Sequence, residues 1–211
     1  FESIYALDLE LFNKNLCDLM EGKKTVVPEF DFKTGSRRWK KETLELPKNG
    51  ILLIEGIHGL NEMLTASIPK ENKFKIYISA LTQLNLDNHN RIATTDVRMI
   101  RRIVRDSLSR GYGAEDTLKM WPSIRRGEEK NIFVFQEEAD VMFNSSLIYE
   151  LCVLKKYAEP ELSKIREESP VYYEAMRLKS FLHFFKDVDK NLVPENSIVR
   201  EFVGGSCFYK Y

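Results

Sequence analysis

The stretch GILLIEG, residues 50–56, decides the fold class that the sequence predicts. Its apolar residues form a continuous run instead of alternating with polar ones, and such a run is typical of a strand buried on both faces of a parallel sheet. The run ends at Glu55, and open parallel sheets bind ligands beyond the carboxyl ends of their strands. A carboxylate at such a position can hold a magnesium ion directly or through water. The alternative for Glu55 is a structural carboxylate that caps a helix or orders a loop.

Two further apolar stretches, residues 74–78 and residues 139–143, are predicted to be strands of the same sheet. Between them lie two stretches with helical periodicity, residues 85–108 and residues 114–130. Strands that alternate with helices in this order predict an α/β fold, with a parallel sheet flanked by helices.

The N-terminal part is predicted to contain an amphipathic helix over residues 8–21, followed by an exposed hairpin or loop over residues 25–46. Within the second segment, the stretch PEFDFKTGSR places two aromatic residues around an acid, with Arg37 a few residues later. A loop of this composition can stack on a planar base and bind hydroxyl groups. A plain hairpin is the simpler alternative.

The character of the sequence changes after residue 160. A helix over residues 170–186 and a short strand over residues 197–202 are predicted there. We therefore expect a principal domain over residues 1–159 and a C-terminal helical extension over residues 160–211 that packs on the same core.

The strongest concentration of charge lies in residues 98–110, which contain five arginines and one aspartate, a local charge of +4. At helical spacing, four of the arginines share one broad face: Arg98, Arg101, Arg102 and Arg105. Planar guanidinium groups match phosphate oxygens and keep their charge, so this face is a candidate phosphate site. The alternative is a solvated helix face with internal ion pairs.

The composition excludes several classes of protein. The 211 residues include 32 basic and 32 acidic side chains, and a net charge of zero argues against a general nucleic-acid coat protein. No apolar run is long enough to span a membrane, and three widely spaced cysteines indicate a reducing compartment. We expect a cytoplasmic protein without nucleic-acid or membrane partners. The absence of an initial Met suggests that Phe1 is an internal residue of a longer protein.

In this order, these features resemble the uridine kinase and phosphoribulokinase family of P-loop kinases, most closely the long bacterial nucleoside kinases that carry a TGS-type domain before the kinase. The resemblance runs across nearly the whole chain. Its most specific pieces are ALD at 6–8, PEFDF at 28–32, IEGIH at 54–58 and the stretch 96–106. It implies a P-loop kinase-like sheet with an arginine-rich lid helix, and transfer of the γ-phosphoryl group of ATP or GTP to a nucleoside 5′-hydroxyl with Mg²⁺.

For the nucleoside substrate, the resemblance implies five contact residues. Asp8 matches the acid that holds the ribose hydroxyls, and Phe30 and Phe32 match an aromatic loop around the base. Arg37 and Arg98 match residues on the substrate side.

For the phosphate side, the resemblance implies a lid that closes over the nucleotide. Arg101 and Arg105 would act as catalytic residues on the transferring phosphate, and together with Arg110 they would bind the nucleotide cofactor. Glu55 would lie near the magnesium ion.

Two departures from the family's pattern matter. The P-loop and the catalytic aspartate of the family lie upstream of the segment that begins this chain, and GKKT at 22–25 is no substitute, because it lacks the first glycine and follows a helix. We expect the first strand, phosphate loop and general base to be missing, and the chain alone to be inactive. In addition, better-known uridine kinases have Tyr in place of Phe30 and His in place of Gly35, which leaves the preferred nucleoside open.

Two hypotheses follow. The first is an ATP-dependent nucleoside kinase, of which this chain is the major part. The second is a non-catalytic domain that binds a nucleoside or a protein partner. Assembly into a homo-oligomer is open under both.

Overall fold

The computed structural model describes residues 3–31 and 35–208, and the chain divides into two compact units. Unit 1 consists of Phe1–Tyr77 and Arg126–Val141, and unit 2 consists of Ile78–Arg125 and Met142–Tyr211. Residue 160 lies inside a helix of unit 2, and a domain boundary at this residue stays a prediction.

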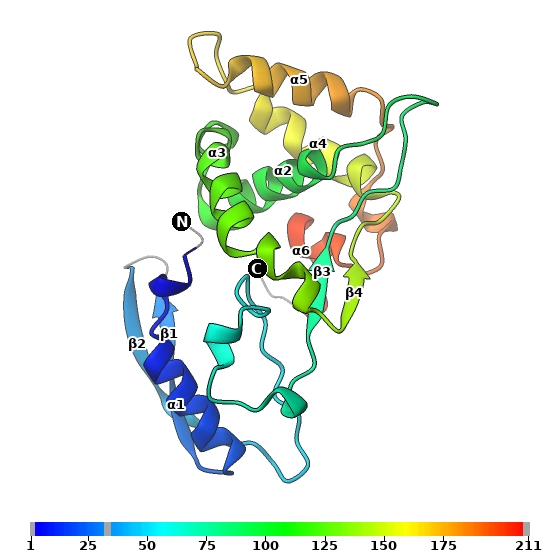
Figure 1. The fold of residues 1–211 in the computed structure, drawn as a ribbon. Helices are drawn as coiled ribbons and strands as arrows, with labels where there is room; N and C mark the ends of the chain where they lie inside the picture. Colours follow the sequence, from blue (N-terminus) through cyan, green and yellow to red (C-terminus); the bar gives the residue numbers. More distant parts are fainter. Residues whose placement is uncertain (1–2, 32–34, 209–211) are drawn as a thin grey trace. The chain divides into compact units, whose positions relative to one another are not determined.

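After a short 3₁₀ helix, Ile4–Ala6, unit 1 contains helix α1 (Leu9–Met20) and an antiparallel hairpin of β1 (Thr25–Asp31) and β2 (Ser36–Leu44) (Figure 1). The predicted helix and hairpin are therefore confirmed. The Asp8 side chain caps the start of α1, and the helix ends where Gly22 adopts a left-handed φ of 74°, a conformation that glycine adopts without strain.

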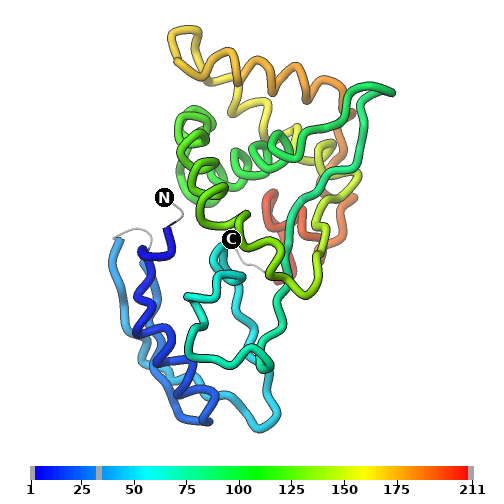
Figure 2. The backbone as a smooth tube through the Cα atoms, viewed as in Figure 1, coloured from blue at the N-terminus to red at the C-terminus, as the bar shows by residue number. Residues whose placement is uncertain are grey.

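The predicted buried strand at residues 50–56 is wrong. This segment is an irregular connection (Figure 2), in which the Ile51 and Leu53 side chains are 92% and 82% exposed while Leu52 and Ile54 are half-buried. A strand of a parallel sheet needs hydrogen-bonded neighbours, and none of the strands in the described residues pairs with this segment. The apolar run therefore indicated that this segment tends to be buried. It did not indicate which other segment would pack against it.

The rest of unit 1 contains short 3₁₀ helices, Glu62–Thr65, Lys70–Asn72 and Phe133–Glu138. Glu62, at the start of the first of these helices, binds two lysines that follow the second: its carboxylate accepts hydrogen bonds from Lys73, at 2.7 Å, and from Lys75. The hydrogen bonds from Lys73 and Lys75 lower the pKa of Glu62 from 4.5 to about 2.

The ion pairs of Glu62 predict a specific loss of stability in acid. Because the folded pKa lies below the unfolded value, the contribution of Glu62 is complete above about pH 4.5 and disappears as the pH falls towards about 2. In urea denaturation, the difference between the wild type and Glu62→Gln should be constant from neutral pH to about pH 5 and should shrink below that. A difference in unfolding free energy that does not change with pH would show that the ion pairs of Glu62 do not contribute to stability.

Strands β3 (Ile76–Ser79) and β4 (Val141–Asn144) form a two-stranded sheet. The backbone hydrogen bonds run in a parallel sense, since the carbonyl of Lys75 accepts from Asp140 and that of Ser79 accepts from Ser145. The predicted strands at 74–78 and 139–143 are thus confirmed as parallel neighbours, shifted by one or two residues.

Unit 2 is mainly helical (Figure 1). Its helices are α2 (Thr94–Arg105), the π-helical turn Asp106–Arg110, α4 (Glu150–Leu162), α5 (Tyr172–Leu182) and α6 (Val199–Val203), and α3 (Ala114–Asn131) begins in it.

Several predictions for this unit need correction. The helix predicted over 85–108 begins only at Thr94, because residues 85–93 form a loop closed by a bridge between Asn85 and Arg91. The strand predicted at 197–202 is helix α6. Helix α4 was not predicted. Pro160 lies within its last turn, and a proline usually marks the end of a helical pattern in a sequence.

The core of unit 2 is a single apolar cluster around α2. Ile100, Ile103 and Val104 of this helix are fully buried, and Leu178 and Val199 from the C-terminal helices belong to the same cluster. Residues beyond 160 therefore take part in the packing that positions α2.

Candidate functional site

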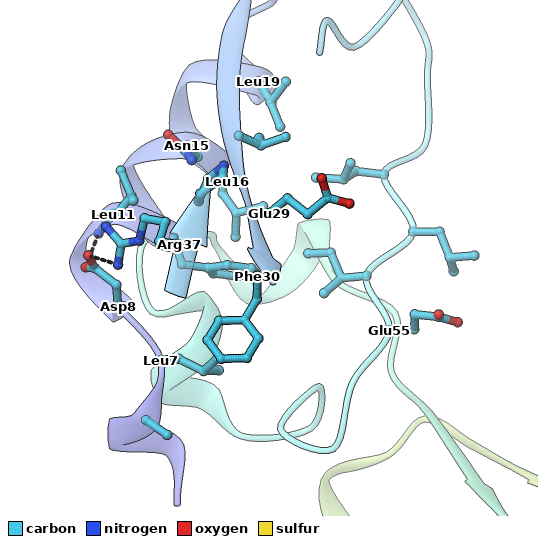
Figure 3. A pocket seen from close by; sticks show the side chains of 17 residues that line it. Leu7, Asp8, Leu11, Asn15, Leu16, Leu19, Glu29, Phe30, Arg37 and Glu55 are labelled. Carbon is cyan, nitrogen blue, oxygen red and sulfur yellow. Dashed lines mark hydrogen bonds and ion pairs between the residues drawn. The ribbon is translucent and has the colours of Figure 1, made fainter. Parts of the chain in front are cut away.

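A pocket of about 470 Å³ lies within unit 1 (Figure 3). Leu11, Asn15 and Leu19 form one wall, because residues four apart lie on the same face of α1. The other walls are residues 27–30 of β1 and the segment 52–55. The volume falls within the range of about 300–1,000 Å³ that small-molecule sites usually have.

Asp8 and Arg37 form a polar pair at one side of this pocket (Figure 3). The Asp8 carboxylate accepts a hydrogen bond from the Leu11 backbone N–H at 3.0 Å and an ion-paired hydrogen bond from Arg37 Nη2 at 2.9 Å. The backbone hydrogen bond from Leu11, and then the one from Arg37, hold the pKa of Asp8 below its usual value of 3.8. Asp8 is therefore both a helix cap and a charged, partly exposed acceptor at the pocket.

The hairpin brings an aromatic side chain to the same place. In the register of the hairpin, Phe30 of β1 lies opposite Arg37 of β2, and the Phe30 side chain is 55% exposed and lines the pocket. Arg37 is also held against the Trp39 ring, with 5.9 Å between its guanidinium carbon and the ring centroid. Phe32, the second predicted aromatic contact, lies outside the described residues.

Glu55 lies at the opposite side of the pocket. Figure 3 shows its carboxylate on the side away from Asp8 and Phe30. Within residues 3–31 and 35–208, no group of three or more His, Cys, Asp or Glu side chains is placed to hold a metal ion. Magnesium in nucleotide sites is commonly held by one or two carboxylates together with phosphates and water, so a lone Glu55 is compatible with such a site and its role stays a prediction.

Asn15 is a pocket residue that the sequence reasoning missed. It is only 9% exposed, and its carboxamide has no hydrogen-bond partner among the side chains and backbone groups that the structure describes. A polar residue four positions from Leu11 and from Leu19, on an otherwise apolar helix face, was the signal that the sequence offered.

The arginines of α2 belong to unit 2 and do not share one environment. Arg101 is buried: its Nε donates to Glu150, and its Nη2 donates to the backbone carbonyl of Ser145 at 2.7 Å. Its guanidinium also lies 5.3 Å from the centroid of the Phe202 ring. The four arginines of the predicted broad face therefore differ in exposure, because at about 100° per residue Arg101 lies at the edge of that face, beside buried Val104.

Three other arginines gather around the buried carboxylate of Asp106. The distances from this carboxylate are 3.3 Å to Arg102 Nε, 3.4 Å to Arg105 Nε and 3.6 Å to Arg110 Nη1. Arg98 lies apart from them, with its guanidinium 6.0 Å from the centroid of the Trp121 ring.

The predicted site residues therefore fall into two sets. Unit 1 brings Asp8, Phe30, Arg37 and Glu55 to one pocket, and unit 2 brings Arg105 and Arg110 together around Asp106. Arg98 and Arg101 of unit 2 have other neighbours, and their predicted roles at a substrate stay predictions.

Comparison with known proteins adds an independent observation. The family model described as "Phosphoribulokinase / Uridine kinase family" matches residues 1–148. The chain belongs to this family. The resemblance inferred from the sequence motifs is thereby confirmed.

Two uridine kinases are among the relatives of this member of the phosphoribulokinase / uridine kinase family. The enzyme of Macrococcus caseolyticus is 30% identical over 126 residues, which make up 60% of this chain and 52% of the relative. That of Staphylococcus epidermidis is 26% identical over 143 residues, 67% of this chain and 60% of the relative. The chain thus spans roughly half to three-fifths of the length of these relatives.

A relative with a different name shows a higher identity over a shorter stretch. The inorganic pyrophosphatase TTM2 of Arabidopsis thaliana is 44% identical over 64 residues, 30% of this chain and 9% of that protein. This match covers less than a third of the chain and carries no statement about its substrate.

Residues 149–211 of this family member lie outside the range that the family model matches. They include Glu150 and Phe202, which contact the guanidinium of Arg101. They also include Arg177, which makes a bidentate ion pair with Asp96 at 2.7 and 2.8 Å. The C-terminal helices thus fix the start and the middle of α2. No helix in the described part of the chain is both long and apolar enough to cross a bilayer.

Proposed function

We propose that the whole protein to which this chain belongs is a nucleoside kinase, which transfers the γ-phosphoryl group of ATP or GTP to the 5′-hydroxyl of a nucleoside. The observation that carries the proposal is the Asp8–Arg37 pair beside exposed Phe30 at one pocket, in a member of this kinase family. The 211 residues contain no GxxxxGK[ST] motif, so the chain by itself is expected to bind nucleoside without turning over ATP.

On the nucleoside side, Asp8 supplies a fixed negative charge. Its low pKa keeps the carboxylate ionised at neutral pH, and an ionised carboxylate is an acceptor for the two vicinal hydroxyls of a ribose. Arg37 orients this carboxylate, and Phe30 offers a flat apolar surface to a base. Asn15, whose carboxamide has both donors and an acceptor, lines the deeper part of the same pocket beside Leu16 and Leu19.

On the phosphate side, the chain supplies positive charge rather than covalent chemistry. Phosphoryl transfer depends on positioning and on stabilising charge at the transferring group, and guanidinium groups do both. We assign Arg105 and Arg110 of unit 2 to the nucleotide phosphates. Glu55 of unit 1 would hold a magnesium ion. When bound, that ion would help to neutralise the charge of the phosphate chain.

The experiment that tests the proposal measures ADP release by the whole protein with each of a panel of nucleosides. The expected result is ADP release that depends on a nucleoside, with little release in its absence. No nucleoside-dependent ADP release with any member of the panel would contradict the kinase function. Calorimetry of the 211-residue chain with the same nucleosides distinguishes the kinase from the alternative, a non-catalytic binding domain. For such a domain we expect nucleoside binding by the chain and no turnover by the whole protein.

A further inference from the structure

Asn15 is a buried polar residue whose hydrogen-bonding groups are unused in the fold. The residue is only 9% exposed, and its carboxamide has no hydrogen-bond partner among the groups that the structure describes. Burying an amide without hydrogen bonds costs free energy, and such groups are rare in folded proteins. Because Asn15 lines the pocket of unit 1, a molecule in that pocket can supply the missing hydrogen bonds.

Asn13, two positions earlier on α1, has the opposite arrangement. Its carboxamide nitrogen donates to the backbone carbonyls of Leu9, at 2.9 Å, and Leu64, at 3.2 Å. Its carboxamide oxygen accepts from the backbone N–H of Ser67, at 3.0 Å, and from the Ser67 hydroxyl, at 2.8 Å. Residues two positions apart do not share a helix face, so the two carboxamides have different surroundings. The carboxamide of Asn13 stabilises the fold through these hydrogen bonds, and that of Asn15 does not.

The surroundings of Asn15 are those of a ligand site. Leu11 and Leu19, one helical turn before and after it, and Leu16 beside it give this wall of the pocket an apolar surface. Small-molecule pockets are usually lined by apolar side chains and contain a few polar groups, which fix the orientation of the ligand. A single carboxamide on an apolar wall therefore has the position of an orienting group.

The position of Asn15 relative to Asp8 fits a molecule of the size of a nucleoside. Both residues line the pocket from the side of α1 (Figure 3). They lie seven positions apart, which is roughly 10 Å along the axis of a helix at 1.5 Å per residue. A nucleoside has about this length between its ribose hydroxyls and the outer edge of its base, with a hydrogen bond at each end. A ribose bound at Asp8, with its base against Phe30, therefore brings that edge towards Asn15.

We propose that Asn15 is a specificity-determining residue, which binds the Watson–Crick edge of the nucleoside base. Its oxygen accepts from a ring N–H while its nitrogen donates to the neighbouring carbonyl, as uracil and hypoxanthine allow. Turned by half a rotation, the same carboxamide donates to a ring nitrogen and accepts from a neighbouring amino group, as cytosine allows. The ligand class is thus a nucleoside whose base carries a donor and an acceptor side by side. The inference rests on the proposed function for the nucleoside itself, and on the contrast with Asn13 for the role of the carboxamide.

The test is calorimetry of the 211-residue chain with uridine and with 3-methyluridine, in which a methyl group replaces the hydrogen on the ring nitrogen. Inosine and 1-methylinosine form the equivalent pair for a purine. We expect the wild type to bind the unmethylated member of at least one pair about tenfold or more tightly. In Asn15→Ala this preference should disappear, because the affinity for the unmethylated nucleoside falls and that for the methylated one does not. A role of Asn15 in the fold alone would lower both affinities by the same factor.

Asn13→Ala is the matched control, since it makes the same substitution on the same helix. It removes the hydrogen bonds to Leu64 and Ser67 and should lower the melting temperature by about 3 °C or more. Asn15→Ala should melt at or above the temperature of the wild type, because it breaks no hydrogen bond within the fold. Both variants gain the same helix propensity, which cancels when they are compared. The nucleoside preference of Asn13→Ala should equal that of the wild type.

Three results would overturn the proposal. The first is a wild type that binds no member of either pair or binds both members equally. The second is a preference that Asn15→Ala retains, and the third is a melting temperature of Asn15→Ala as low as that of Asn13→Ala. Nucleoside-dependent ADP release by the whole protein is a separate readout. The kinase function can therefore stand without a base contact at Asn15, and the base contact can stand in a protein that binds nucleosides without turning over ATP.

Discussion

Replacing Glu150 by Leu should destabilise unit 2 by about 3–5 kcal/mol, because the substitution leaves the Arg101 charge buried without its partner. The Arg101 and Glu150 side chains are only 10% and 2% exposed, and Glu150 also accepts hydrogen bonds from the Ser146 hydroxyl and the Leu147 backbone. The pair thus connects α2 to the start of α4. Exchange of the backbone amides of α2 and α4 in hydrogen-exchange experiments measures the loss.

The double variant Arg101→Met/Glu150→Leu should regain much of this stability, because it removes both buried charges. Glu159→Gln is the control on the same helix, since its weak pair with Lys155 at 4.0 Å should contribute no more than about 1 kcal/mol. A loss below about 1 kcal/mol for Glu150→Leu would show that the buried pair is not a structural anchor.

This prediction also bears on the catalytic role expected for Arg101. If Arg101 acts on the transferring phosphate, a folded Arg101→Met protein should lose turnover more than nucleoside affinity. If it is only a structural anchor, stability should fall and the turnover of the remaining folded protein should be kept. The two readouts separate the roles.

Replacing Asp8 by Asn should weaken nucleoside binding by about tenfold or more, because a neutral amide is a poorer acceptor for ribose hydroxyls than an ionised carboxylate. Asn caps helices about as well as Asp, so its side-chain oxygen can still accept from the Leu11 N–H and preserve the start of α1. Calorimetry with a nucleoside measures the change. Because the pKa of Asp8 lies below 3.8, the affinity of the wild type should not change between neutral pH and about pH 5.

Asp18→Asn provides the matched control for this variant. Asp18 lies on the same helix, pairs with Lys14 and Lys23, and does not line the pocket. Its substitution removes one exposed carboxylate and should leave nucleoside affinity unchanged. Unchanged affinity in Asp8→Asn would mean that Asp8 is a helix cap and no more.

The sequence predicted local elements where periodicity and caps agree. Helices α1 and α3, the β1–β2 hairpin and the parallel pair of β3 and β4 follow from such patterns. Residues 50–56 and α4 were mispredicted for a different reason. An apolar run shows that a segment tends to be buried but not which segment pairs with it, and Pro160 in the last turn of a helix resembles a stop signal.

The site could be predicted residue by residue only where a motif fixes the position. Asp8, Phe30 and Arg37 were predicted and lie at one pocket, because a helix cap and the hairpin register bring them there. The partners of the arginines were not predictable in the same way. Glu150 lies 49 residues from Arg101, whereas the four-residue spacing of Asp106 from Arg102 and from Arg110 is present in the sequence and fits the alternative of internal ion pairs on this helix face.

The most direct test of the proposed kinase function is to follow the labelled γ-phosphoryl group of ATP in a reaction with the whole protein and a nucleoside. We expect the label to appear on the nucleoside 5′-hydroxyl, and we expect Asp8→Asn to lower its rate of appearance at subsaturating nucleoside. Label found only in inorganic phosphate, or label that stays in ATP with every nucleoside tried, would contradict it.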